Sequence, residues 1–233
     1  MQLSILKEWI ERFKKYLAKP QSRALLHLYE SQQLFAQHWD TEAADFATMY
    51  DQSLQNNTTK RLWKREAYEP KRLLLAFTTL DADYLRFIFR DLFNEAIEPA
   101  TRASRFIFHC DELLQQYKTT NPRSIDNNHY HDDYQMVCLY LAFRYPKQYT
   151  LYHQEAFQAF LRLLNSRNIL ESHDMERFFK IMRTVQKLLL KEEELIQCHL
   201  ARFPQANADL REHLLLAYEF YRFCTASQVK PPF

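Results

Sequence analysis

The chain has 233 residues, of which 47 % are hydrophobic, and its 31 basic and 29 acidic side chains leave a formal net charge of +2. It contains 18 phenylalanines and 14 tyrosines but no glycine, which excludes the glycine-dependent motifs of the P-loop, the dinucleotide fingerprint, the kinase loop and the nucleophile elbow. The balanced charge gives no overall field that would steer the protein toward nucleic acid or membrane, so any electrostatic site must be local.

The first half of the chain is predicted to be helical, because its apolar residues recur every three to four positions. Asp40 is a suitable N-cap for the third of these helices, and Asp81 begins the clearest one. Pro20 is expected to end the first helix, because proline has no backbone N–H to continue it. The first helix has an apolar stripe from Leu6 to Leu17, and the second covers about 22–38. The third, after Asp40, has an apolar face from Phe46 to Leu54, the fourth, from Asp81, has a buried side from Tyr84 to Phe93, and the fifth covers about Pro99–Lys118.

A polar stretch, residues 119–130, interrupts the helical pattern, and helices resume after it at 131–144, about 148–165, about 173–202 and about 208–225. The sequence therefore predicts an all-α, irregular multi-helix bundle of about 9–11 helices, with helix in at least about 60 % of residues. The bundle is expected to form either two helical lobes, 1–118 and 131–226, joined by the polar stretch, or one continuous domain.

The cysteines and the N-terminus bear on the compartment. Cys110, Cys138, Cys198 and Cys224 are far apart and lie in apolar contexts, so buried reduced thiols are expected. The N-terminal stretch carries charges within its apolar residues and has no small-residue cleavage site, unlike a signal peptide. No run approaches the ~18 apolar residues of a membrane span. The expected location is the cytoplasm, with no membrane partner.

The stretch from Lys60 to Arg72 is the candidate nucleic-acid site, because six basic residues alternate there with two aromatic ones. Basic groups neutralise phosphates, and aromatic faces stack on unpaired or flipped bases. The alternative is a solvated turn between helices, with Trp63 as a core anchor. The candidate residues are Lys60, Arg61, Trp63, Lys64, Arg65, Tyr68, Lys71 and Arg72.

Two further patterns are better explained by structural roles than by binding. Arg177, Lys180, Arg183 and Lys187 form a basic stripe that could follow a phosphate backbone, but a solvated face opposite the apolar side of the helix is the favoured interpretation. The downstream acids Glu192, Glu193 and Glu194 would weaken phosphate attraction further. The stretch from His129 to Asp133 has metal-ligand residue types, but two histidines at i and i+2 face apart on a helix. We predict no metal, no cofactor and no catalytic residues, and therefore no enzyme.

The segment from His131 to Tyr149 contains an acidic pair, a short helix and the sequence LAFRYP. It resembles the N-terminal helical region of McrB-type AAA+ proteins, the nucleotide-driven motor subunits of modification-dependent restriction systems. Other compatible pieces are His38-Trp39-Asp40, Ala44-Asp45-Phe46, Phe89–Phe93 and Lys191–Leu195. The resemblance implies a helical recognition module that acts with an AAA+ motor and a nuclease subunit. It does not identify any residue of this sequence as a DNA contact.

Two functions remain open at this point. The first is a non-catalytic recognition module of a prokaryotic restriction or defence system, which binds nucleic acid for an AAA+ motor. The second is a helical protein–protein adaptor or oligomerisation module with no nucleic-acid contact, in which the many aromatic residues form a groove for a partner helix. The near-neutral charge favours the adaptor, and the local basic-aromatic stretch favours DNA.

Overall fold

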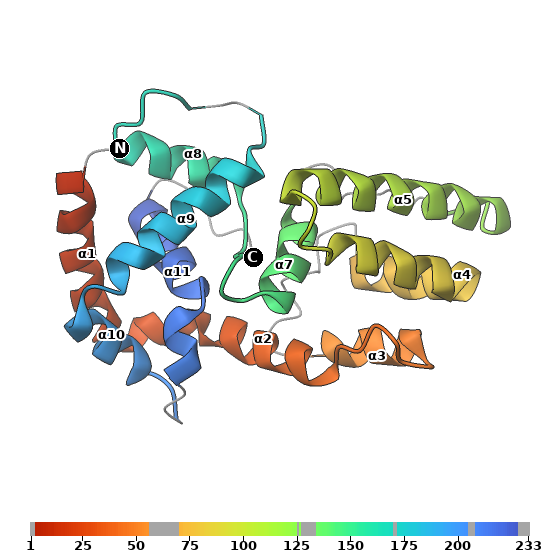
Figure 1. Cartoon of the computed structure of the whole chain (residues 1–233), viewed down its shortest axis with the longest axis horizontal. Helices are drawn as coiled ribbons and strands as arrows, with labels where there is room; N and C mark the ends of the chain where they lie inside the picture. The colour runs from red at the N-terminus through yellow and green to blue at the C-terminus, as the bar shows by residue number, and fades with distance from the viewer. Residues whose placement is uncertain are drawn as a thin grey trace. The chain divides into compact units, whose positions relative to one another are not determined.

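The computed structural model describes residues 3–55, 70–124, 126, 134–169, 172–204 and 208–227. Over these residues the chain forms ten α-helices and two short 3-10 helices and no strand, and 74 % of it is helical (Figure 1). The predicted all-α multi-helix class is confirmed.

The chain divides into two compact units, and each is described by itself. Unit 1 combines residues 1–29 with 145–232, whereas unit 2 is residues 30–144. This division does not follow the predicted lobes of 1–118 and 131–226. Unit 1 is discontinuous in sequence because the first helix packs against helices from the C-terminal end of the chain. Such pairing between distant segments leaves no trace in local periodicity.

Unit 1 is built around the last helix of the chain. In this unit α11 contacts α8, α9 and α1, and α1 also contacts α10. Phe220 of α11 lies edge-on to Phe13, with ring centroids 5.4 Å apart, and Tyr221 lies edge-on to Phe178 at 5.9 Å. Its elements are α1 (Leu3–Leu17), η1 (Pro20–Leu25), α8 (Gln154–Leu163), α9 (Met175–Leu189), α10 (Glu193–Leu200), η3 (Ala208–Glu212) and α11 (Leu215–Thr225).

Unit 2 has α4 and α5 side by side, and they make its most extensive helix pair (Figure 1). Its core surrounds Phe89, whose ring is 4.9 Å from Trp39, 5.4 Å from Phe106 and 5.2 Å from Tyr140, all edge-on. Edge-to-face contacts of this kind favour one packing arrangement beyond the apolar area that they bury. Its elements are the larger part of α2 (Leu26–His38), with α3 (Phe46–Ser53), α4 (Pro70–Leu92), α5 (Pro99–Thr120) and α7 (Gln135–Arg144).

Several helix boundaries follow from capping. Asp81 leaves the helical conformation (φ −156°, ψ 92°) within α4 and accepts a hydrogen bond from the Tyr84 amide, so a helical segment does begin there, as predicted. The third helix differs from the prediction. Asp45 rather than Asp40 caps it, by accepting a hydrogen bond from the Thr48 amide at 3.0 Å, because the Asp40 carboxylate is used in a tight turn with Glu42.

The long helix predicted over about 173–202 is wrong, because the structure has two helices there, α9 and α10. The chain turns between Leu189 and Glu193, and acidic side chains in the first turn of α10 are favoured by its dipole. Elsewhere α8 ends without glycine, since Asn165 adopts the left-handed conformation (φ 49°) that glycine usually takes after a helix.

None of the four cysteines, all of which lie among the described residues, forms a disulfide bond. Cys110, Cys138 and Cys224 are buried, and Cys198 is partly exposed. Burial raises the pKa of the Cys110 and Cys224 thiols, which keeps them protonated and unreactive. These cysteines therefore act as small core residues.

Candidate nucleic-acid interface

Most of the predicted nucleic-acid site lies outside the described residues. This holds for six of its members: Lys60, Arg61, Trp63, Lys64, Arg65 and Tyr68. The structure describes the last two, Lys71 and Arg72, which lie in the first turn of α4.

Lys71 and Arg72 have different environments although they are neighbours in sequence. The Lys71 ammonium lies 2.8 Å from the Asp51 carboxylate and donates to the Asp51 carbonyl at 2.9 Å, and its side chain is 14 % exposed. These contacts fasten the start of α4 to α3. The Arg72 side chain is 49 % exposed and forms an ion pair with Asp126. Of the two, only Arg72 presents its charge to solvent.

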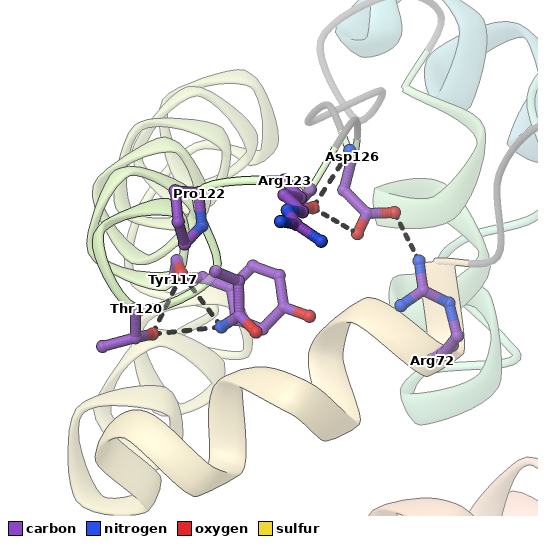
Figure 2. A pocket seen from close by; sticks show the side chains of 8 residues that line it. Arg72, Tyr117, Thr120, Pro122, Arg123 and Asp126 are labelled. Atoms are coloured by element: carbon purple, nitrogen blue, oxygen red, sulfur yellow. Dashed lines mark hydrogen bonds and ion pairs between the residues drawn. The ribbon is translucent and has the colours of Figure 1, made fainter.

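Arg72 lines an open pocket of about 680 Å³ between the start of α4 and the end of α5 (Figure 2). The ion pair of Arg72 with Asp126 stands on one side, and Tyr117 stands near the end of α5. Arg123 also lines the pocket and is exposed, with no ion-pair partner among the described residues. The remaining lining residues are Thr120, Asn121, Pro122 and Ser124.

The pocket has the size of a small-molecule site but mixed charge. Two guanidinium groups and a tyrosine ring suit an anionic, aromatic ligand such as a nucleotide. The Asp126 carboxylate, however, neutralises Arg72 and would repel phosphate. Sequence reasoning missed Tyr117 and Arg123, because they follow Arg72 by more than forty residues and only the packing of α4 on α5 brings them together.

The basic stripe on α9 is exposed, as expected of a solvated helix face. The side chains of Lys180, Arg183 and Lys187 are exposed on one helix face. None of them lies within 4.0 Å of a carboxylate oxygen of any described residue. Among the residues that the structure describes, Arg183 donates only to the Gln148 carbonyl, at 3.3 Å. These three residues are called the α9 stripe below.

Arg177 precedes the stripe but is partly used within unit 1, because it donates to the Ser166 hydroxyl and the Asn168 carbonyl. Lys191 follows the stripe just beyond the end of α9 and is exposed. Both add positive charge at the ends of the same surface.

Two of the three acidic residues that follow the stripe in sequence are ion-paired with other cations, and Glu192 has no ion-pair partner among the described residues. Glu193 pairs with Arg211 at 3.3 Å, and Glu194 pairs with Lys14 at 3.0 Å. The charges of Glu193 and Glu194, which would otherwise weaken phosphate attraction at α9, are offset by Arg211 and Lys14 of unit 1.

Unit 1 also contains a buried polar cluster that the sequence did not reveal. Arg202 forms a bidentate ion pair with Glu219, and the same carboxylate accepts a hydrogen bond from the Tyr29 hydroxyl at 2.7 Å. His199 contacts Arg202 through Nδ1 at 2.5 Å. Every member of the cluster is no more than 5 % exposed. A substrate cannot reach these groups, so the cluster is structural.

The remaining sequence candidates add no further site. The stretch from His129 to Asp133 lies outside the described residues. Within the described ranges, no three histidine, cysteine or acidic residues are placed to hold a metal ion. No helix in these ranges combines the length and apolar character that crossing a membrane requires.

Comparisons with known proteins found no match: no protein-family model, no curated protein and no solved structure is significantly similar to this chain. The physical properties of the site are therefore the basis for the function proposed next.

Proposed function

We propose that this chain is a non-catalytic recognition module that binds nucleic acid through its phosphates. The observation that carries the proposal is the α9 stripe: three exposed cations on one helix face, with no carboxylate partner among the described residues. In the same unit some surface cations are ion-paired, such as Arg12 with Glu8 and Arg211 with Glu193. Others, such as Lys7, Lys15 and Lys19, are exposed and likewise have no carboxylate partner among the described residues, so the distinguishing feature of the α9 stripe is the alignment of its three cations on one helix face. An unpaired row of cations is what a phosphate backbone can neutralise.

The geometry of α9 sets the size of the contact. Lys180 and Lys187 are seven residues apart, which corresponds to a rise of ~10 Å along the helix. Phosphates follow one another every ~3.4 Å of duplex axis on each strand, so the stripe can contact about three of them. Binding that displaces about three counterions is weak and falls steeply with salt.

The predicted basic-aromatic stretch Lys60–Arg72 has a separate role in this proposal. Its aromatic residues would stack on bases, as a contact of unit 2 that is tested separately from the α9 stripe of unit 1. Arg72 belongs to this stretch and is described by the structure. It lines the open pocket of unit 2 together with Arg123, and both arginines are exposed.

For the biological setting, we propose a prokaryotic restriction or defence system, in which the module acts in the cytoplasm and selects nucleic acid for an AAA+ motor and a nuclease subunit. The support is the resemblance of the LAFRYP segment to McrB-type proteins. In the structure, residues 136–143 of this segment are buried in unit 2, so they support the fold of the module and are not its contact surface.

The test uses fluorescence anisotropy with labelled duplex and single-stranded oligonucleotides at salt concentrations of about 50–200 mM. The triple variant Lys180→Gln, Arg183→Gln, Lys187→Gln should bind at least about tenfold more weakly at the lowest salt. Its slope of log K against log[salt] should fall by about 2–3, because each lost phosphate contact removes ~0.7–0.9 from that slope.

A matched control removes the same charge from ion-paired positions. The variant Arg12→Gln, Lys147→Gln, Arg211→Gln also loses three cations of unit 1, all of them paired with carboxylates. It should keep the salt slope of the unmodified protein. Equal loss of binding in the two triple variants would show that only net charge matters and would contradict the proposal.

The adaptor function is favoured by a different observation, the exposure of two large aromatic side chains in unit 2. Phe87 on α4 and Phe108 on α5 are 46 % and 58 % exposed. Nucleic-acid binding that is absent, or unaffected by the α9 substitutions, would leave a helical adaptor or oligomerisation module as the better account.

A further inference from the structure

The α4–α5 pair of unit 2 presents an aromatic surface to solvent. Phe108 and Phe87 each lie edge-on to His109, at 5.4 and 5.8 Å, and Phe87 stacks on Tyr84 at 6.1 Å. The four rings therefore form one continuous patch, called the aromatic patch below. More than half of the Phe108 side chain is exposed. Large apolar surfaces of this kind, grouped and rimmed by polar residues, are typical of interaction sites.

A hydrogen-bonded carboxylate fixes the edge of the aromatic patch. The Tyr84 hydroxyl donates to Glu112 Oε2 at 2.6 Å, and His109 Nδ1 lies 3.1 Å from the same oxygen. These two contacts, the hydrogen bond from Tyr84 first, lower the pKa of Glu112 and keep it ionised. The carboxylate therefore stands at a defined place beside Phe108. Its negative charge makes the aromatic patch unsuitable for nucleic acid.

The opposite edge of the patch carries a positive charge. Arg105 lies one turn before Phe108 on α5, and Glu112 lies one turn after it. Arg105 forms an ion pair with Asp91 of α4 at 2.8 Å, and its side chain is 44 % exposed. A guanidinium has five donors, so Arg105 can keep Asp91 and accept a second carboxylate partner. Phe108 is thus flanked by opposite charges on the same helix face.

This order of residues is self-complementary. When two copies of one helix pair antiparallel about a two-fold axis at residue 108.5, position 105 of one copy faces position 112 of the other. The two phenylalanines then meet at the axis, with an attractive Arg105–Glu112 pair on either side. On the same helix face, the next positions outward are Thr101 and Gln116, which also face each other and are uncharged. No like charges are opposed along the exposed face of α5.

We propose that the aromatic patch is an isologous dimerisation surface, on which α5 of one copy packs antiparallel against α5 of a second copy. An isologous interface uses the same patch on both subunits and closes after two copies, so it predicts a dimer and no larger assembly. The surface is small, so the dimer is weak and depends on concentration. This inference rests on unit 2 alone and is independent of the nucleic-acid proposal.

The test is sedimentation velocity of the full chain over a wide range of concentrations, up to about 500 µM. The unmodified chain should pass from monomer to dimer with increasing concentration. Phe108→Ser should weaken the dimer by about tenfold or more, because it removes the apolar centre of the contact. The matched control is Leu3→Ser, which removes another half-exposed apolar side chain, in unit 1, and should leave the dimer unchanged.

Charge reversal at positions 105 and 112 is the most specific test of the antiparallel dimer. Arg105→Glu alone places two carboxylates opposite each other at both ends of the interface, and Glu112→Arg alone places two cations there, so each variant should be monomeric. A one-to-one mixture should dimerise to within about threefold of the unmodified chain, because every pair is again of opposite charge. Only an antiparallel contact between positions 105 and 112 predicts this recovery.

Several results would overturn the inference. They are an unmodified chain that stays monomeric, a dimer that survives Phe108→Ser, and charge variants that fail to recover on mixing while their circular dichroism spectra stay native. An unmodified monomer would leave the aromatic patch to a partner of another kind. Failure of α9-dependent nucleic-acid binding would not affect the dimer, so the two proposals fail separately.

Discussion

The guanidinium of Arg202 and the carboxylate of Glu219 form a two-point ion pair in the interior of unit 1, with distances of 2.7 Å (Nη1 to Oε2) and 2.9 Å (Nη2 to Oε1). Their side chains are 3 % and 2 % exposed. Arg202 also donates to the Ser22 carbonyl at 2.7 Å, so one guanidinium links η1, α11 and the turn after α10. Burial acts to lower the pKa of Arg202, because it disfavours the charged guanidinium. The hydrogen bonds to Glu219 and the negative charge of Glu219 outweigh burial, so the pKa of Arg202 is raised.

Removing the Glu219 charge should strongly destabilise unit 1. The variant Glu219→Gln leaves the Arg202 charge buried without a counter-charge, for which we expect a loss of about 3–5 kcal/mol in the free energy of unfolding. Urea unfolding followed by circular dichroism measures this loss. As a control, Arg211→Gln breaks the exposed pair with Glu193 and should cost no more than ~1 kcal/mol. Similar costs for the two variants would contradict the assigned role of the buried pair.

A second prediction concerns the pH dependence of stability. Burial, followed by the charge of Arg202, lowers the pKa of His199 from 6.5 to about 3. The native protein therefore keeps His199 neutral at pH values where the unfolded chain binds a proton. Because the folded-state pKa is the lower one, this stability is fully present above about pH 6.5. It is lost progressively as the pH falls toward about 3, with a slope of up to ~1.4 kcal/mol per pH unit.

The variant His199→Gln isolates this contribution. It keeps an acceptor for Arg202 but removes the titrating group, so its free energy of unfolding should fall less steeply between pH 6.5 and 5 than that of the unmodified protein. We expect a difference of about 1–2 kcal/mol over that interval. Urea unfolding at both pH values measures it. His213, whose pKa burial also lowers, is present in both proteins and cancels in the comparison. Parallel pH profiles would refute the assignment.

The third prediction concerns Trp63, which lies outside the described residues. As a base-stacking residue of the Lys60–Arg72 stretch, Trp63 should lose fluorescence when short oligonucleotides bind. Trp63→Ala should then weaken binding by about 1–3 kcal/mol and leave the thermal midpoint nearly unchanged. As a core anchor, the same substitution should instead cost about 3–5 kcal/mol of stability. Thermal unfolding must therefore be measured first. Unchanged stability with unchanged affinity would remove Trp63 from the site.

Local features of the fold were predictable because helix formation depends on neighbours three and four residues apart. Asp81 begins a helical segment by capping Tyr84, and Pro99 occupies the first position of α5, where its missing N–H costs nothing. The turn between α9 and α10 was missed because Leu190, Lys191 and Glu192 are all compatible with a continuous helix. Only the packing of the two helices in unit 1 requires the chain to turn there.

The candidate interface was less predictable, since the availability of a charge depends on distant partners. Lys71 and Arg72 look equivalent in sequence. In the structure the Lys71 side chain is largely buried in its ion pair with Asp51, whereas the Arg72 side chain remains about half exposed. The stripe on α9 looked like an ordinary solvated face. Its lack of carboxylate partners within the described ranges became visible only in the structure, where Lys14 and Arg211 take up the charges of Glu194 and Glu193.

By itself, the sequence determined that this protein is helical, because the absence of glycine and the three-to-four spacing of apolar residues act through local backbone geometry. The tertiary structure alone decided which side chains meet. Tyr29 reaches Glu219 across 190 positions of the chain, and Lys14 reaches Glu194 across 180. Such contacts are fixed by the packing of whole helices, and they determine which charges are buried in pairs and which remain free to bind a partner.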